Sequence, residues 1–257
     1  MRRIQSVDRS LDILEALANS DRPMGVSELG KQLGLHVATT HGILTTLLSR
    51  GYVEQEDETN RYRLGYKFYQ MARLYINKCD LHQVALPHLH DLRSALGERV
   101  SLAALRNFEI VFLIVLDSYH LLRLKPSVEN STHVHCTAIG KVLLAFQPTS
   151  YIDCYLENTE LLRYTPNTIC DKEAFLQHLD EIRVKGYALN EEEEIEGVFG
   201  IGAPVFYSNG FLAGAVSTAI PMERLDRRLI PEKADLVVNT ARLITQELGV
   251  TILQERG

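Results

Sequence analysis

The stretch that decides the fold runs from residue 36 to residue 50 and reads His36-Val37-Ala38-Thr39-Thr40-His41-Gly42-Ile43-Leu44-Thr45-Thr46-Leu47-Leu48-Ser49-Arg50. Apolar side chains recur in it at helical spacing, which predicts a helix with one buried face. That face carries Thr40, Ile43, Leu44, Leu47 and Leu48. The opposite face carries Ala38, Thr39, His41, Gly42 and Thr45. A face of small and polar side chains can approach base edges in the major groove of DNA.

Shorter elements flank this helix. Residues 6–19 are predicted to form a helix capped by Ser6, with Val7, Leu11, Leu14, Leu17 and Ala18 on its apolar face. A second helix is expected from Ser27 to Leu33, followed by a tight turn at Gly34. Gly51 ends the third helix, and residues 52–56 and 61–64 read as the strands of a hairpin. Helix, short helix, turn, helix and hairpin together predict a winged helix-turn-helix over residues 1–64.

Two arginines on the second strand of the hairpin are candidates for DNA contact. Arg61 and Arg63 share one face of the strand, and Tyr62 and Leu64 share the other. The arginines could be solvated charges on an ordinary hairpin, but behind a helix-turn-helix we expect them to reach phosphate or the minor groove. The complete set of predicted DNA contacts is Ser27, Val37, Ala38, Thr39, Thr40, His41, Thr45, Arg61 and Arg63.

Composition and charge agree with a DNA-binding head on an acidic body. The chain of 257 residues carries a formal net charge of -6. Residues 1–79 hold 11 Lys and Arg against 9 Asp and Glu, about +2, and the remainder holds 16 against 24, about -8. No long apolar run or secretory signal is visible, so we expect a cytoplasmic protein without membrane contact. The cysteines at positions 79, 136, 154 and 170 are scattered, which disfavours a zinc knuckle or a disulfide framework.

Beyond the hairpin the periodicity changes from helical to mixed. Residues 65–78 are predicted to form a linker helix, and residues 79–257 an α+β domain with an antiparallel sheet. Strands are expected at 100–105, 110–116, 121–124, 200–206 and 212–218, and helices at 84–96, 137–146, 172–185 and 231–248.

Three stretches resemble the IclR family of bacterial transcriptional regulators. They are Ser6-Val7-Asp8-Arg9-Ser10-Leu11-Asp12-Ile13-Leu14; then Ser27-Glu28-Leu29, Gly34-Leu35, Thr39, His41 and Gly51-Tyr52-Val53; and Thr137-Ala138-Ile139-Gly140-Lys141-Val142-Leu143-Leu144-Ala145 with Glu191-Glu192-Glu193-Glu194-Ile195-Glu196-Gly197 downstream. The resemblance implies a homodimer or tetramer that binds double-stranded operator DNA. It also implies a GAF/profilin-like effector domain, which senses a small carboxylate-bearing or aromatic metabolite, and regulation of a catabolic operon, usually by repression.

The recognition helix and the effector pocket both depart from the family pattern. The family's Pro-Lys-Ser-Thr-Val-His-Arg reads His36-Val37-Ala38-Thr39-Thr40-His41-Gly42 here, which implies an unusual operator and more dependence on the hairpin. The family's effector contacts fall on Ala138, Ile139, Asn190, Gly200, Ser217 and Ala219. The family has serine at the last two of these positions, and only Ser217 keeps a polar side chain here. We therefore expect a pocket less polar than one for glyoxylate or pyruvate, and an effector that is larger or more apolar.

Other features have simpler interpretations. The run Glu191 to Glu194 is predicted to be a solvated rim, because neighbouring side chains of an extended segment point to opposite faces. His133 and His135 would share a strand face beside Cys136, but no third and fourth ligand accompany them, so neither a metal ion nor a cofactor is expected. An enzyme or thiol-based sensor with an accessory DNA-binding head is the alternative. Without a base-orienting partner for Cys136 or any catalytic fingerprint, the sequence predicts a regulator and no enzyme.

Overall fold

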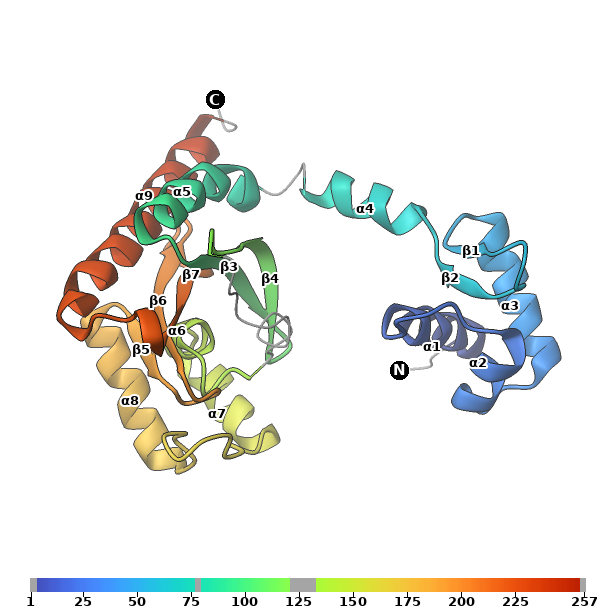
Figure 1. The fold of residues 1–257 in the computed structure, drawn as a ribbon, viewed down its shortest axis with the longest axis horizontal. Coiled ribbons are helices and arrows are strands. Elements are labelled where there is room, and N and C mark those ends of the chain that lie inside the picture. Colours follow the sequence, from blue (N-terminus) through green and yellow to red (C-terminus); the bar gives the residue numbers. More distant parts are fainter. Residues whose placement is uncertain (1–3, 77–79, 121–132, 255–257) are drawn as a thin grey trace. The chain divides into compact units, whose positions relative to one another are not determined.

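The computed structural model of the chain describes residues 4–76, 80–120 and 133–254. The chain divides into two compact units, residues 1–78 and 79–257 (Figure 1). The strand expected at 121–124 and the cysteine at position 79 lie outside the described residues.

The N-terminal unit is a winged helix-turn-helix. Its helices are α1 (Gln5–Ala18), α2 (Val26–Leu33) and α3 (Val37–Ser49), and its hairpin pairs β1 (Val53–Gln55) with β2 (Tyr62–Leu64) in antiparallel register. Helix α4 (Lys67–Ile76) follows. A core that includes Ile13, Leu29, Leu44, Val53 and Tyr62 holds the three helices and the hairpin together. The order of elements predicted from the sequence is therefore confirmed.

The start and the buried face of α1 differ from the prediction. Ile4 occupies the N-cap position, so Ser6 lies inside the helix and does not cap it. The buried side chains are Ile13, Ala16 and Leu17. Val7 and Leu11, which were expected in the core, are 51% and 50% exposed. The periodicity found a helix but did not separate its core-facing apolar residues from those on its surface.

The described strands of the C-terminal unit form an antiparallel sheet in the order β4-β3-β7-β6-β5. Their bounds are β3 (Arg99–Arg106), β4 (Glu109–Leu116), β5 (Ala188–Glu191), β6 (Val198–Phe206) and β7 (Leu212–Pro221). Short 3-10 turns at Met222–Arg224 and Arg227–Leu229 follow β7. Four of these strands were predicted from the sequence. Strand β5, which is short and ends at the first residue of the acidic run, was not.

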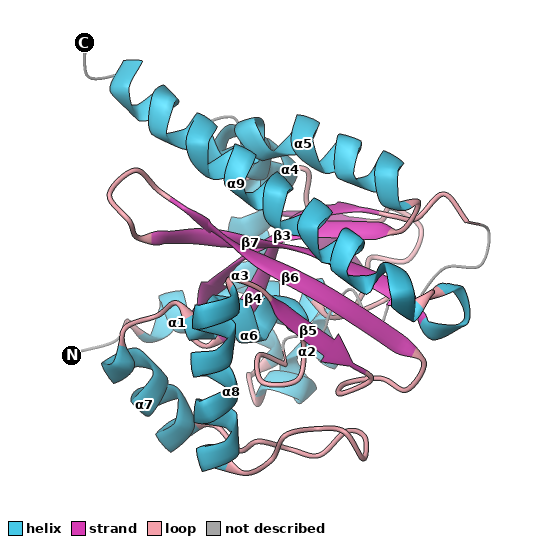
Figure 2. Cartoon of the chain, turned by 90° about the vertical axis from the view of Figure 1, so that its left-hand side faces the viewer, coloured by secondary structure: helices cyan, strands magenta, loops and turns pink. Residues whose placement is uncertain are grey.

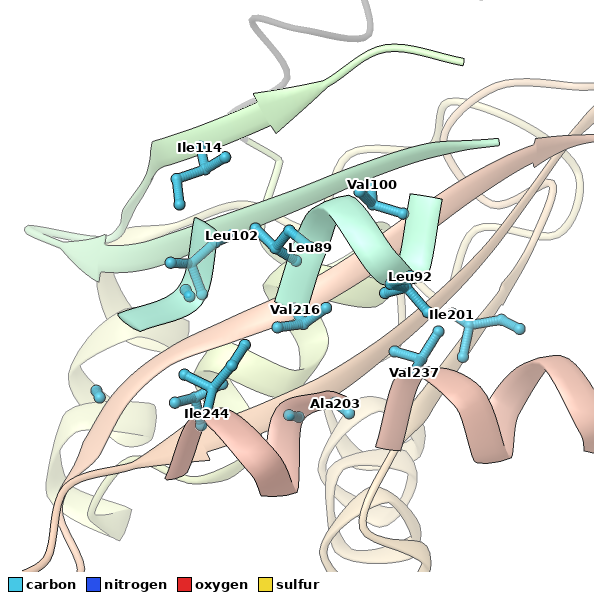
Figure 3. Close-up of a cluster of buried hydrophobic side chains, with 14 of the residues drawn as sticks. Leu89, Leu92, Val100, Leu102, Ile114, Ile201, Ala203, Val216, Val237 and Ile244 are labelled. Carbon is cyan, nitrogen blue, oxygen red and sulfur yellow. The ribbon is translucent and has the colours of Figure 1, made fainter. Parts of the chain in front are cut away.

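Helices cover both faces of this sheet (Figure 2). Helices α5 (Asp80–Leu96) and α9 (Ile230–Gln254) pack on one face. Their interface with the sheet includes Leu89, Val216 and Ile244 (Figure 3). Helices α6 (Ala138–Ala145), α7 (Thr149–Asn158) and α8 (Lys172–Lys185) cover the other face. The prediction of an α+β domain with an antiparallel sheet is confirmed, although α7 was not predicted.

Two glycines let α6 lie unusually close to its surroundings. A Cβ atom on Gly202 of β6 would lie 2.9 Å from the carbonyl oxygen of Ala138. A Cβ atom on Gly140 would lie 2.4 Å from the carbonyl oxygen of Val134. Because real Cβ atoms do not approach so closely, these positions require glycine. The first turn of α6 is thereby held directly against the middle of the sheet.

Candidate functional site

The outer face of α3 is accessible along most of its length. Val37 is 54% exposed, and Ala38, His41 and Thr45 are also exposed, while Thr39 is half-buried. The hydroxyl of Thr45 donates to the carbonyl of His41 at 2.9 Å and keeps its lone pairs as acceptors. Ser27 of α2 is also exposed. These residues offer a surface of small, polar and apolar groups to a partner.

Thr40 was predicted on the buried face of the helix, and its inclusion among the DNA contacts was wrong. It is fully buried, and its hydroxyl donates to the carbonyl of His36 at 3.2 Å. A Cβ atom on Gly30 would lie 3.3 Å from the Thr40 Oγ1 atom, so the threonine fills the corner between α2 and α3. The helical spacing that places Thr40 beside Leu44 on the inner face is the reason it cannot reach a groove.

The two arginines of the hairpin are paired with carboxylates of their own unit. Arg61 Nη1 lies 3.1 Å from Glu28 Oε2 and 3.0 Å from the carbonyl of Pro23. Arg63 lies 3.3 Å from Glu54, its partner across the hairpin. Ion pairs this exposed contribute only about 0–1 kcal/mol to stability, so exchanging a carboxylate for a phosphate would cost little. In this structure both guanidinium groups are held beside the hairpin by these carboxylates.

The second unit contains a cavity of about 60 Å³ that brings all six predicted effector contacts together. Ala138 and Ile139 come from the first turn of α6, Asn190 from β5, Gly200 from β6, and Ser217 and Ala219 from β7. The other lining residues are Arg99, Ser101, Phe112, Thr137, Glu194, Val198 and Thr218. Residues from widely separated stretches of the chain thus face one space.

Hydrogen bonds fix the polar groups around this cavity. The Thr137 hydroxyl accepts from the Gly140 amide at 3.1 Å and caps α6. Ser101 and Ser217 face each other across paired strands, with their hydroxyl oxygens 2.9 Å apart. The Asn190 side chain accepts from the Glu193 amide at 2.8 Å. The lining is therefore ordered by contacts within the protein, as expected of a preformed small-molecule site.

Polar residues that the sequence did not identify also line the cavity. Arg99, which is 7% exposed, and Ser101 enter it from β3. They escaped the sequence analysis because the pairing of Arg99 with Ala219 and of Ser101 with Ser217 depends on a strand register that no local motif encodes. Its volume of about 60 Å³ is well below the roughly 300–1,000 Å³ of typical small-molecule pockets. A larger effector would require its walls to move.

Beneath the cavity lies a buried ion pair. Lys141 of α6 is fully buried and its ammonium donates to the Glu193 carboxylate, with His178 Nε2 of α8 at 3.1 Å. Burial lowers the pKa of Lys141 and raises the pKa of Glu193, and each charge opposes the shift of the other. This pair ties α6 to the acidic run by a contact that solvent does not screen.

The acidic run is not the solvated rim that its composition suggested. Glu191 is exposed beside Arg227, but Glu193 is buried against Lys141, and Glu194 lies 3.0 Å from His133 Nδ1. The segment is also not extended, since Glu192 has a φ of 57°. The bend at Glu192 replaces the strict alternation of an extended segment, and both Glu193 and Glu194 find partners within the protein.

The segment His133 to Cys136 is likewise a turn where a strand was expected. His133 faces Glu194 and His135 Nε2 lies 2.9 Å from the carbonyl of Leu162, while both rings lie near that of Tyr164. Cys136 is fully buried, and burial raises the pKa of its thiol far above the usual range. A nucleophilic or redox-sensing cysteine needs a lowered pKa and access to solvent, which this thiol lacks.

Comparisons with known proteins cover nearly the whole chain. Residues 6–57 match the IclR helix-turn-helix domain, and residues 73–246 match the bacterial transcriptional regulator IclR C-terminal domain. A glycerol operon regulatory protein of Streptomyces coelicolor is 33% identical, over 96% of this chain and 98% of the relative. The DNA-binding transcriptional repressor YiaJ of Escherichia coli is 31% identical, over 98% of this chain and 91% of the relative.

A solved structure is similar over the same span. An IclR homolog of Microbacterium hydrocarbonoxydans, complexed with 4-hydroxybenzoate, is 25% identical with a TM-score of 0.79, covering 95% of this chain and 98% of that one. Within residues 4–76, 80–120 and 133–254, no helix has the length and apolar character needed to cross a membrane.

Proposed function

Because the chain belongs to the IclR family of bacterial transcriptional regulators, we propose that it binds operator DNA through the outer face of α3 and releases or tightens its grip when a small carboxylate enters the cavity beside α6. The relatives are regulators of transcription and not enzymes, and several are named as regulators or repressors of operons. By this proposal the protein acts in the bacterial cytoplasm, on the promoter of a catabolic operon, as a repressor.

The exposed face of α3 is the observation that supports DNA binding. Thr39 and His41 carry hydrogen-bonding groups, and Val37 and Ala38 carry methyl groups that suit the thymine methyl. The proposed contacts are Ser27, Val37, Ala38, Thr39, His41, Thr45, Arg61 and Arg63. Arg61 and Arg63 would exchange their carboxylates for phosphates, which fixes position on the duplex without reading sequence.

The lining of the cavity supports a small anionic effector. The guanidinium of Arg99 and the backbone amides at the start of α6 both favour a carboxylate, and the one carboxylate of the lining, Glu194, is paired with His133. A volume of about 60 Å³ favours an acid of few heavy atoms. An aromatic acid such as the 4-hydroxybenzoate in the Microbacterium relative would need the cavity to widen.

Exposed apolar side chains support self-association. Val7 and Leu11 of α1 are half exposed, as are Tyr69, Met71 and Leu74 of α4. A homodimer built on such residues would present two copies of α3 to half-sites about one helical turn, roughly 34 Å, apart. We propose a dimer, or a tetramer made of two dimers, in which the linker residues 65–78 help to pair the DNA-binding units.

Binding of fluorescent DNA at several salt concentrations tests this function, with the protein's own promoter region compared against random sequence. We expect Thr39→Ala to reduce the preference for the promoter, because it removes a base contact. Arg61→Ala should weaken binding to both DNAs and lower the salt slope by about 1. Thr149→Ala, which changes an exposed threonine on α7 of the other unit, is the matched control and should change neither. No salt-sensitive preference for the promoter, with or without small acids, would refute the proposal.

A further inference from the structure

Three potential metal ligands converge at the start of α6. His133, Cys136 and Glu194 each direct one ligand atom into a common space, and these atoms all lie within 4.8 Å of one another. The Glu194 carboxylate and the His133 Nδ1 atom are 3.0 Å apart. Cys136 is fully buried, the Glu194 side chain is nine-tenths buried and His133 is half-buried. The sequence could not supply the third ligand, because Glu194 is 61 residues from His133 along the chain.

The donor set suits a borderline transition metal. One imidazole nitrogen, one sulfur and one carboxylate oxygen are the ligand types of zinc, with bonds of about 2.0–2.3 Å. Ligand atoms around a tetrahedral ion with such bonds lie roughly 3.3–3.8 Å apart. Small side-chain movements would bring the present atoms to that spacing. Three protein ligands leave a fourth position for water or an exogenous group.

The electrostatic surroundings favour a cation here. A carboxylate oxygen of Glu194 lies within 4.8 Å of the Cys136 sulfur, and Cys136 is fully buried. A divalent ion between them would attract both the carboxylate and the sulfur. One zinc ion with one thiolate and one carboxylate is neutral overall, which removes much of the cost of burying the charges.

Neighbouring groups already hold the imidazole in place. The ring of Tyr164 lies against that of His133 with centroids 4.2 Å apart. The Thr137 hydroxyl donates to the His133 carbonyl at 2.9 Å, so the cap of α6 fixes the backbone of the ligand. A cavity of about 340 Å³ lined by His133, Tyr164 and Glu160 lies beside the imidazole and gives a path to it. Orientation of ligands by outer contacts is characteristic of metal sites.

We infer that His133, Cys136 and Glu194 form a zinc-binding site that ties the first turn of α6 to the acidic segment. Zinc bonds to the sulfur, nitrogen and carboxylate oxygen, and the thiol proton passes to solvent. Because Glu194 also lines the effector cavity, the ion stiffens one wall of that cavity. The inference rests on the ligand geometry and stands whether or not the chain binds DNA as proposed.

Zinc titration of the full chain, first freed of metal by dialysis against a chelator, tests the site. We expect one zinc ion per chain and a rise in the melting temperature with zinc concentration. His133→Gln and Glu194→Gln should each weaken zinc binding by about tenfold or more. The matched controls Cys154→Ser and His120→Gln remove an exposed thiol and an exposed imidazole, and should leave zinc affinity unchanged.

Cobalt in place of zinc reports the sulfur ligand directly. Wild type should show a thiolate-to-cobalt charge-transfer band that Cys136→Ser lacks. If Cys136→Ser does not fold, the two Gln variants decide the matter, since neither empties a fully buried position. The inference is overturned by a wild type that takes up no zinc, by zinc affinity equal in both Gln variants and wild type, or by a cobalt spectrum without the thiolate band.

Discussion

Helices α3 and α6 carry the two functions proposed for this chain, and they are built in opposite ways. Every residue of α6 is buried, its N-terminus is capped by Thr137, and it contains a lysine locked to a carboxylate. On α3, all of which the structure describes, only Thr40 and Leu44 are buried, and no side chain caps its N-terminus. A helix packed on one side leaves a face for a partner, whereas a helix packed on all sides acts by shaping a cavity.

The largest expected effect concerns the buried charge that α6 carries and α3 lacks, the ammonium of Lys141. Glu193→Ala leaves the Lys141 ammonium buried without its partner, which should lower the free energy of unfolding by about 3–5 kcal/mol. Chemical denaturation of the isolated variant measures this. Glu191→Ala is the matched control, because its exposed pair with Arg227 contributes about 1 kcal/mol or less. Equal effects at the two positions would show that Lys141 is not held by Glu193.

A pair of glycines sharpens the comparison, because the same substitution should have opposite signs in the two helices. Gly140→Ala should destabilise by about 1–3 kcal/mol, since its Cβ would meet the backbone of Val134. Gly42→Ala meets nothing within 4 Å and should stabilise by roughly 1 kcal/mol through helix propensity. Thermal unfolding of both variants tests this, and a stabilised Gly140→Ala would contradict the close packing of α6.

Lowering the pH should destabilise the protein at His178 of α8, which contacts Lys141 of the buried helix α6. Burial and the nearby Lys141 lower the pKa of His178 to about 4, below its ordinary value near 6.5. The unfolded chain therefore binds the proton more readily, and the stability contributed by neutral His178 is present above pH 6.5 and lost as the pH falls toward 4. The expected loss is up to about 3 kcal/mol.

Stability measured across this pH range should depend less on pH in His178→Gln than in wild type. His41→Gln, on the exposed face of α3, should leave the pH dependence as it is. A pH profile of His178→Gln that matches wild type would show that the imidazole does not titrate differently on folding.

The contrast between α3 and α6 also explains which features of the fold and of the candidate sites could be predicted from the sequence. The amphipathic pattern of α3 predicted the helix and most of its outward face, and it placed Thr40 correctly on the buried face. Including Thr40 among the DNA contacts as well was wrong, because its hydroxyl bonds within the unit. Helix α6 is apolar except for Lys141 and is buried on every side, so its sequence gave no pattern of exposure. The resemblance to the family nevertheless identified six residues that line the cavity. Hydrophobic periodicity shows where a helix passes from core to solvent, and α6 has no such boundary because all of its residues are buried.

What the sequence could not supply was long-range pairing. Arg99 reaches the cavity through the register of β3 with β7, and Glu194 reaches His133 through a bend at Glu192. Both depend on contacts between distant segments, which no local spacing specifies. The same limit made Glu193 look like a solvated charge, since its partner Lys141 lies on another element.

Amide hydrogen exchange of the full chain, with and without its own promoter DNA, tests most directly whether α3 is the face that DNA covers. We predict slower exchange in residues 36–46 and in the hairpin at saturating DNA, with the rates in α6 unchanged. Exchange in α3 that stays the same while DNA is bound would contradict the account.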